Sequence, residues 1–198
     1  MSAGTVLVMS GNAIHMDYYS LLGPIDPQIQ NDQGRFVPAL GYLEQYDRMI
    51  EKSREGTLTD AETVILLQKF DPAELAFYEH AKELTVSLLE SWLSKYKFQT
   101  WTAHSSSGAP VTDDERKLRA KEIANQLNDT NLWHTHSRGI GISVLKDTLR
   151  LVIEDYSDNH ERRRLVRDYF DLASDYYGTY GGTANPRVFV QSRNTFAE

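Results

Sequence analysis

A long apolar stripe between residues 72 and 98 constrains the fold more than any other part of the sequence. Apolar side chains recur there every three or four positions, the period of one face of an α-helix, at Leu75, Tyr78, Ala81, Leu84, Leu88, Leu89, Trp92, Leu93 and Tyr96. The charged residues fall on the other face, at Glu79, Lys82, Glu83 and Glu90. A face this apolar must be removed from water. We expect the rest of the chain to cover it, with a second copy in a homo-oligomer as the alternative.

Three shorter segments are also predicted to be helical. Apolar residues with helical spacing run through residues 37–54. Thr59 and Thr112 each stand three positions before a glutamate, Glu62 and Glu115, and this spacing is the capping-box signature of a helix start. The chain is therefore expected to be rich in helix.

The remaining segments are predicted to be short strands, loops and one further helix. Extended pieces are predicted at 13–17, 21–25, 149–153 and 188–190, a polar loop at 29–36, and a last helix at 159–177 that ends at Gly178. None of the extended pieces is longer than five residues, so any sheet they form is small.

These elements predict an α/β, helix-rich fold in a single domain, residues 1–198. Within it we expect a region of helix and strand at 1–36 and a helical region at 37–101. A flexible loop rich in serine and glycine follows at 102–111, and the C-terminal region, 112–198, is again helical.

Composition excludes several classes of protein. The chain has 198 residues, of which 40% are hydrophobic, enough for one domain with a core. Its 21 basic and 28 acidic side chains give a net charge of −7, which argues against nucleic-acid binding because phosphate recognition needs clustered Lys and Arg. There is no cysteine, so a disulfide, a thiolate nucleophile and a cysteine zinc site are excluded. No phosphate-loop or dinucleotide fingerprint occurs, and no cofactor is expected.

The sequence has no apolar run of the length that spans a bilayer, and its first residues lack the features of a signal peptide. We therefore expect a soluble, cytoplasmic protein. Membrane association is expected only through a segment that would precede Met1.

Ser2 opens a run of small residues, Ser2-Ala3-Gly4-Thr5, that leads into an apolar segment. The first N–H groups of a helix are unpaired and carry a partial positive charge, which stabilises an oxyanion beside them. Ser2 is therefore a candidate nucleophile, and the N–H of Ala3 is a candidate oxyanion donor. The simpler interpretation is that Ser2 is only the N-cap of a helix.

Two blocks of the sequence resemble one protein family. The first comprises MSAGT, VMSGNAI and YSLLGPIDPQ within the first 28 residues, and the second comprises AKEIANQL and WHTHSRGI between Ala120 and Ile140. Both are similar to the serine dehydrogenase proteinase family, a relative of the signal peptide peptidase SppA and of the Clp protease proteolytic subunit in the Clp/crotonase superfamily. The resemblance implies a serine endopeptidase with a partial Clp/crotonase-like fold that lacks the half preceding the nucleophile.

The resemblance also suggests where a general base and its orienting group lie. Asp26 is interpreted either as a carboxylate beside the helix of the nucleophile, orienting a base or anchoring the loop, or as an Asx-turn residue. Lys52 follows Ser2 at a distance comparable to that of the SppA lysine, although the helix dipole alone favours a lysine in a last helical turn. His136, in the family's His-small-Arg pattern, either organises a turn or acts as the base, since imidazole is the usual proton acceptor for a serine.

Two further patterns are weak. His134 and His136 have the i, i+2 spacing of metal ligands on a strand, but no third ligand follows nearby, so no metal site is expected. His104 lies among three serines in a loop without an orienting partner in the sequence.

Two functions follow from the sequence. The first is a serine peptidase of the Clp/crotonase type, with Ser2 as nucleophile, Ala3 as oxyanion donor and a base drawn from Lys52, His136 or Asp26, acting on a peptide or protein as a homo-oligomer. The second is a catalytically inactive remnant that serves as an interaction or structural protein, because a nucleophile at a fraying terminus is poorly held.

Overall fold

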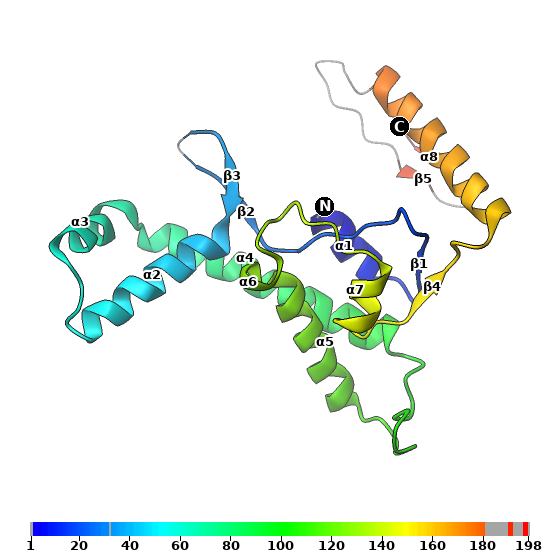
Figure 1. The fold of residues 1–198 in the computed structure, drawn as a ribbon, viewed down its shortest axis with the longest axis horizontal. Helices are drawn as coiled ribbons and strands as arrows, with labels where there is room; N and C mark the ends of the chain where they lie inside the picture. The colour runs from blue at the N-terminus through cyan, green and yellow to red at the C-terminus, as the bar shows by residue number, and fades with distance from the viewer. Residues whose placement is uncertain (1, 32, 181–189, 192–195, 198) are drawn as a thin grey trace. The chain divides into compact units, whose positions relative to one another are not determined.

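The computed structural model describes residues 2–31, 33–180, 190–191 and 196–197. Contacts along the chain form two compact units, residues 1–154 and residues 155–198. The architecture is mixed α/β and rich in helix, as expected from the sequence (Figure 1).

The first unit contains most of the elements. Its helices are α1 (Ser2–Met9), α2 (Ala39–Arg54), α3 (Asp60–Lys69), α4 (Pro72–Trp92), α5 (Asp113–Asn128), α6 (Thr130–Trp133) and α7 (Ile142–Asp147), and the π-helical segment η1 (Leu93–Lys97) continues α4. The strands are β1 (Ile14–Met16), β2 (Gln28–Gln30), β3 (Phe36–Pro38) and β4 (Ile153–Asp155); β1 pairs with β4, and β2 with β3. The second unit holds α8 (His160–Tyr180) and the antiparallel pair β5 (Val190–Gln191) and β6 (Phe196–Ala197).

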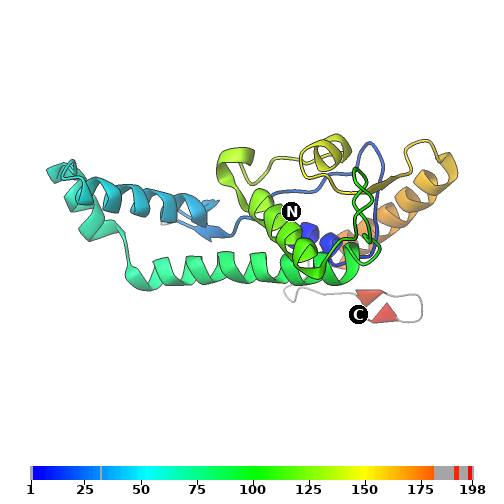
Figure 2. The same cartoon turned by 90° about the horizontal axis from the view of Figure 1, so that it is seen from below.

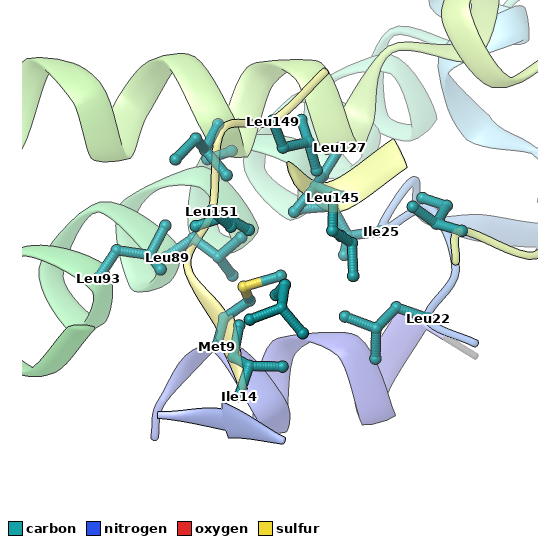
Figure 3. Close-up of a cluster of buried hydrophobic side chains, with 14 of the residues drawn as sticks. Met9, Ile14, Leu22, Ile25, Leu89, Leu93, Leu127, Leu145, Leu149 and Leu151 are labelled. Carbon is teal, nitrogen blue, oxygen red and sulfur yellow. The ribbon is translucent and has the colours of Figure 1, made fainter. Parts of the chain in front are cut away.

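The main hydrophobic core forms where α4 and α5 pack against each other, and chain segments from both ends of the first unit complete it (Figure 3). Its members include Met9, Ile14, Ile25, Leu89, Leu93, Ile123, Leu127, Leu145, Leu149 and Leu151. Burial of this apolar surface is the main driving force that brings residues 9–25 and residues 145–151 together on α4 and α5.

A smaller cluster joins α2 to the first half of α4. It contains Ala39, Leu40, Leu43, Leu75 and Tyr78. The hydroxyl of Tyr42 donates to the carbonyl of Lys69 at 2.7 Å and accepts from the N–H of Asp71 at 3.2 Å, so it fixes the turn between α3 and α4. Together, α2, α3 and the start of α4 form an arm that extends away from α1 (Figures 1 and 2).

The predicted helix starts are confirmed. Thr59 with Glu62, and Thr112 with Glu115, form reciprocal capping boxes at the beginnings of α3 and α5. Such boxes pair two N–H groups that the helix itself cannot satisfy. The helix predicted at 37–54 is observed as α2.

One prediction for extended structure is wrong, and another is correct only in part. The middle of the loop expected at 29–36 is the turn of a β-hairpin, in which the side chain of Asn31 accepts the N–H of Arg35, but the ends of this range are strand, with Ile29 paired to Val37. The strand expected at 149–153 is replaced by irregular chain as far as Val152, whose carbonyl accepts a hydrogen bond from the Lys97 ammonium group at 2.7 Å. Burial lowers the pKa of Lys97.

The other differences are smaller. The extended piece at 21–25 makes only a single bridge, between Leu22 and Ile140. The last helix does not end at Gly178 but continues to Tyr180. Of the strand expected at 188–190, only Val190 lies within the described residues, where it begins β5. No helix of the described residues is long and apolar enough to cross a membrane.

Two leucines on α4 test whether burial in the core, and not helix propensity alone, determines their contribution to the free energy of unfolding. Leu89 is fully buried, whereas Leu84 is 59% exposed although it belongs to the same sequence stripe. We predict that Leu89→Ala lowers the free energy of unfolding by about 2–5 kcal/mol because it leaves a cavity. Leu84→Ala, the matched control with the same change in helix propensity, should cost less than about 1 kcal/mol. Urea denaturation measures both, and equal losses would contradict this packing.

Candidate functional site

Asp26 and His136 form a hydrogen-bonded pair in the first unit. His136 Nδ1 lies 2.8 Å from Asp26 Oδ1, although the two residues are 110 positions apart in the chain. The Asp26 side chain is 3% exposed and that of His136 is 19% exposed. Because an ionised carboxylate can only accept, the Nδ1–H group of His136 is the donor.

The segment that carries Asp26 is fixed from two sides. The buried hydroxyl of Thr5 donates to the carbonyl of Gly23 and accepts from its N–H group, both at 2.9 Å, which ties α1 to this segment. The N–H of Ile25 donates to the carbonyl of Leu127 at the end of α5, at 3.0 Å. The backbone of Asp26 therefore sits between α1 and α5.

The segment that carries His136 is held by the Asp26 segment and by α5. Leu22 and Ile140 exchange two backbone hydrogen bonds, of 3.0 and 2.8 Å. The buried ring of Trp133 donates from Nε1 to the carbonyl of Gln126 in α5. His134 ends α6 in the left-handed conformation, at φ 62°, and so turns the chain toward His136.

The N-terminus of α1 lies beside the segment that carries Asp26. The helix begins at Ser2 and has no acidic residue in its first turn. Ala3 lines an apolar groove of about 510 Å³ together with Ile25 and Pro27, the two residues that flank Asp26. The positive end of the helix is thus close to the segment that holds the carboxylate.

The arrangement can perform acid–base chemistry. A carboxylate bound to the Nδ1–H group of histidine fixes the ring's tautomer and leaves Nε2 as the proton acceptor. The same carboxylate stabilises the imidazolium that forms when Nε2 takes a proton. His136 is partly exposed and Asp26 is buried, which are the exposures that a base and its orienting group require.

Lys52 is not brought to this pair. Lys52 lies in the last turn of α2, its ammonium group bonds to the carboxylate of Glu62, and its side chain is 40% exposed. The hydrogen bond from Lys52 is the largest of the causes that lower the pKa of Glu62, to about 2. The ammonium group of Lys52 is therefore occupied by Glu62 and makes no contact with Asp26 or His136.

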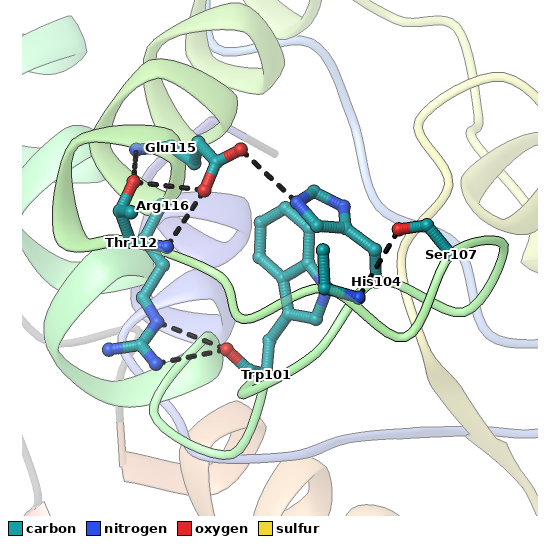
Figure 4. Close-up of polar contacts among 7 residues, drawn as sticks. Trp101, His104, Ser107, Thr112, Glu115 and Arg116 are labelled. Atoms are coloured by element: carbon teal, nitrogen blue, oxygen red, sulfur yellow. Dashed lines mark hydrogen bonds and ion pairs between the residues drawn. The ribbon is translucent and has the colours of Figure 1, made fainter.

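A second histidine–carboxylate pair lies at the start of α5 (Figure 4). His104 Nε2 is 3.1 Å from Oε1 of Glu115, whose other oxygen accepts the N–H and the hydroxyl group of Thr112. These bonds lower the pKa of Glu115, and those from Thr112 contribute more than the bond from His104. The His104 ring also packs edge-on against Trp101, with ring centroids 5.7 Å apart. This pair extends a helix cap and anchors the 102–111 loop.

No group of three or more histidine, aspartate or glutamate side chains in the described part of the chain could hold a metal ion. His134 is exposed, and His136 directs Nδ1 to Asp26 rather than to a second histidine.

No family model, curated protein or solved structure matches the chain. The assignment of the site therefore depends on the geometry above and on the residues that the sequence singled out.

Sequence reasoning found Asp26 and His136 as separate candidates but not as a pair. It also missed Gln28, whose side-chain amide donates to the second oxygen of Asp26 at 2.7 Å, and Thr5, which fixes α1. Gln28 had a signal, because it belongs to the GPIDPQ block. Thr5 had none, since a threonine in an apolar segment does not reveal which distant backbone group it binds.

The ion pair of Lys52 and Glu62 predicts a pH effect on the arm. A folded-state pKa of about 2, below the ordinary 4.5, means that the pair stabilises the fold above about pH 4.5 and that this contribution is lost as the pH falls toward 2. We predict that Lys52→Met raises the pKa of Glu62 toward its ordinary value, while the hydrogen bonds from Thr59 still hold it below that value, as measured by NMR titration of the carboxyl group. Lys69→Met on α3 is the control. An unchanged pKa in Lys52→Met would show that the pair does not form.

Proposed function

We propose that the chain is a serine peptidase of the Clp/crotonase type in which Ser2 is the nucleophile, His136 the general base and Asp26 the group that orients the base. The observation that carries the proposal is the 2.8 Å bond between His136 and a carboxylate that is only 3% exposed. The two sequence blocks that resemble the serine dehydrogenase proteinase family are also the two that contribute this pair.

The reaction follows from these roles. The hydroxyl oxygen of Ser2 attacks the carbonyl carbon of a peptide bond while its proton passes to Nε2 of His136. The oxyanion receives a hydrogen bond from the N–H of Ala3 at the positive end of α1. His136 then protonates the leaving amine, and an acyl-enzyme remains on Ser2 until a water molecule, deprotonated by His136, hydrolyses it.

Of Lys52, Asp26 and His136, the last is best placed to act as the base. Lys52 is held by Glu62 away from α1, and Asp26 is buried against two donors, so neither is free to take a proton from Ser2. His136 is partly exposed and already oriented. The base is therefore assigned to His136.

The proposal includes a homo-oligomer in the cytoplasm. Leu7, Phe77 and Leu84 are each more than half exposed, so the apolar face of α1 and α4 is only partly covered by the first unit. Contact between copies would remove this surface from water. The absence of cysteine suits a reducing compartment.

Labelling with a fluorophosphonate probe tests the proposal. We predict that the purified chain is labelled and that Ser2→Ala abolishes labelling. His136→Ala should slow it by about 10³–10⁶-fold, and Asp26→Asn by about 10⁴-fold because the imidazole loses its tautomer and orientation. His134→Ala and Lys52→Met are matched controls that should retain the rate of the unmodified chain.

A chain that circular dichroism shows to be folded but that the probe does not label would contradict the peptidase proposal. It would favour the alternative of an interaction or structural protein. Labelling that survives Ser2→Ala would move the nucleophile elsewhere.

A further inference from the structure

We propose that Gln28 is a positioning residue that holds the Asp26 carboxylate in the orientation that receives His136. The Gln28 side-chain amide donates to Oδ2 of Asp26 at 2.7 Å, while Oδ1 accepts from His136 at 2.8 Å. The effect of Gln28 on catalysis rests on the proposed function. Its effect on the orientation of the His136 ring does not, because that effect is independent of hydrolysis.

A carboxylate held by one donor alone is poorly oriented. The last torsion of an aspartate is broad and nearly two-fold, so either oxygen can face a given donor. A second donor on the other oxygen selects one orientation and shares the negative charge in a buried place. Gln28 supplies this second donor, since the described residues show no other hydrogen bond to the side chain of Asp26.

Gln28 is itself held by the backbone around it. It begins β2 and lies opposite Pro38 in the hairpin with β3. The carbonyl of the preceding Pro27 accepts the N–H of Ala39, the first residue of α2, at 2.8 Å. The hairpin and the start of α2 therefore determine where the amide points, which gives the arm of the first unit a connection to the site.

Substitution by glutamate separates a positioning role from simple packing, because it preserves shape and replaces the donor by a titrating group. When the new carboxyl group is ionised, it repels Asp26 and cannot donate. When the two adjacent carboxyl groups share a proton, an O–H can replace the amide N–H. A purely structural role would be insensitive to this change of protonation.

The experiment follows the Nδ1 proton of His136 by NMR on the ¹⁵N-labelled full chain, with Asp26→Asn to assign the signal. We predict that the unmodified chain shows this proton at about pH 5 and at about pH 8. Gln28→Glu should lose or broaden it at about pH 8, where the new carboxylate repels Asp26 and cannot donate, and should recover it as the pH is lowered and the pair of carboxyl groups gains a proton. Gln28→Leu should lose it at both values.

Gln30 provides the matched control. It lies two positions further along β2, and its amide donates to the carbonyl of Gly34 rather than to the site. Gln30→Glu and Gln30→Leu should leave the signal unchanged, and circular dichroism confirms that each variant is folded. An unchanged signal in both Gln28 variants would overturn the proposal.

Activity then separates the two proposals. If the chain reacts with the fluorophosphonate probe, Gln28→Leu should slow labelling by about 10–100-fold, the size typical for loss of an outer hydrogen-bond partner. If the chain does not react but the His136 signal responds to Gln28, the peptidase proposal fails while the positioning role stands. If labelling occurs at the same rate in both Gln28 variants, the positioning role fails.

Discussion

The hydrogen bond between Asp26 and His136 joins segments that α1, α5 and α6 hold in place. To bury the carboxylate to 3% exposure, the chain brings residues 110 positions apart into contact between α1 and α5. Thr5 fixes the segment of Asp26 against α1, and Ile140 fixes the segment of His136 against Leu22. Burial of a charge is costly unless it is paired, so this contact constrains how the surrounding core can be built.

Much of the fold is predictable from local patterns. Capping boxes at Thr59 and Thr112 and the apolar spacing of α2 and α4 locate the helices, because these signals depend on residues three or four positions apart. The short strands are not predictable in this way. Residues 149–152 have a β-like composition, but a hydrogen bond from Lys97, more than 50 residues away, occupies the carbonyl of Val152 in place of a neighbouring strand. Tertiary contacts decide such segments.

The site was predicted as a list of residue types and not as a geometry. Asp26 and His136 were singled out by motif, yet nothing local indicates that they meet, since their contact depends on the core formed by α4 and α5. Lys52 was a further candidate by its distance from Ser2 in sequence, and only the structure shows that Glu62 holds it. The role of Gln28 follows once the second oxygen of Asp26 is seen to need a donor.

A double-mutant cycle on Asp26 and His136 tests the central claim most directly. Urea unfolding of the chain, of Asp26→Ala, of His136→Ala and of the double variant gives the coupling free energy between the two side chains. The structure predicts a coupling of about 1–3 kcal/mol, because the bond joins a buried carboxylate to one of its two donors. Effects that add to within about 0.5 kcal/mol would show that the two residues do not interact, and the assignment of the site would fall with them.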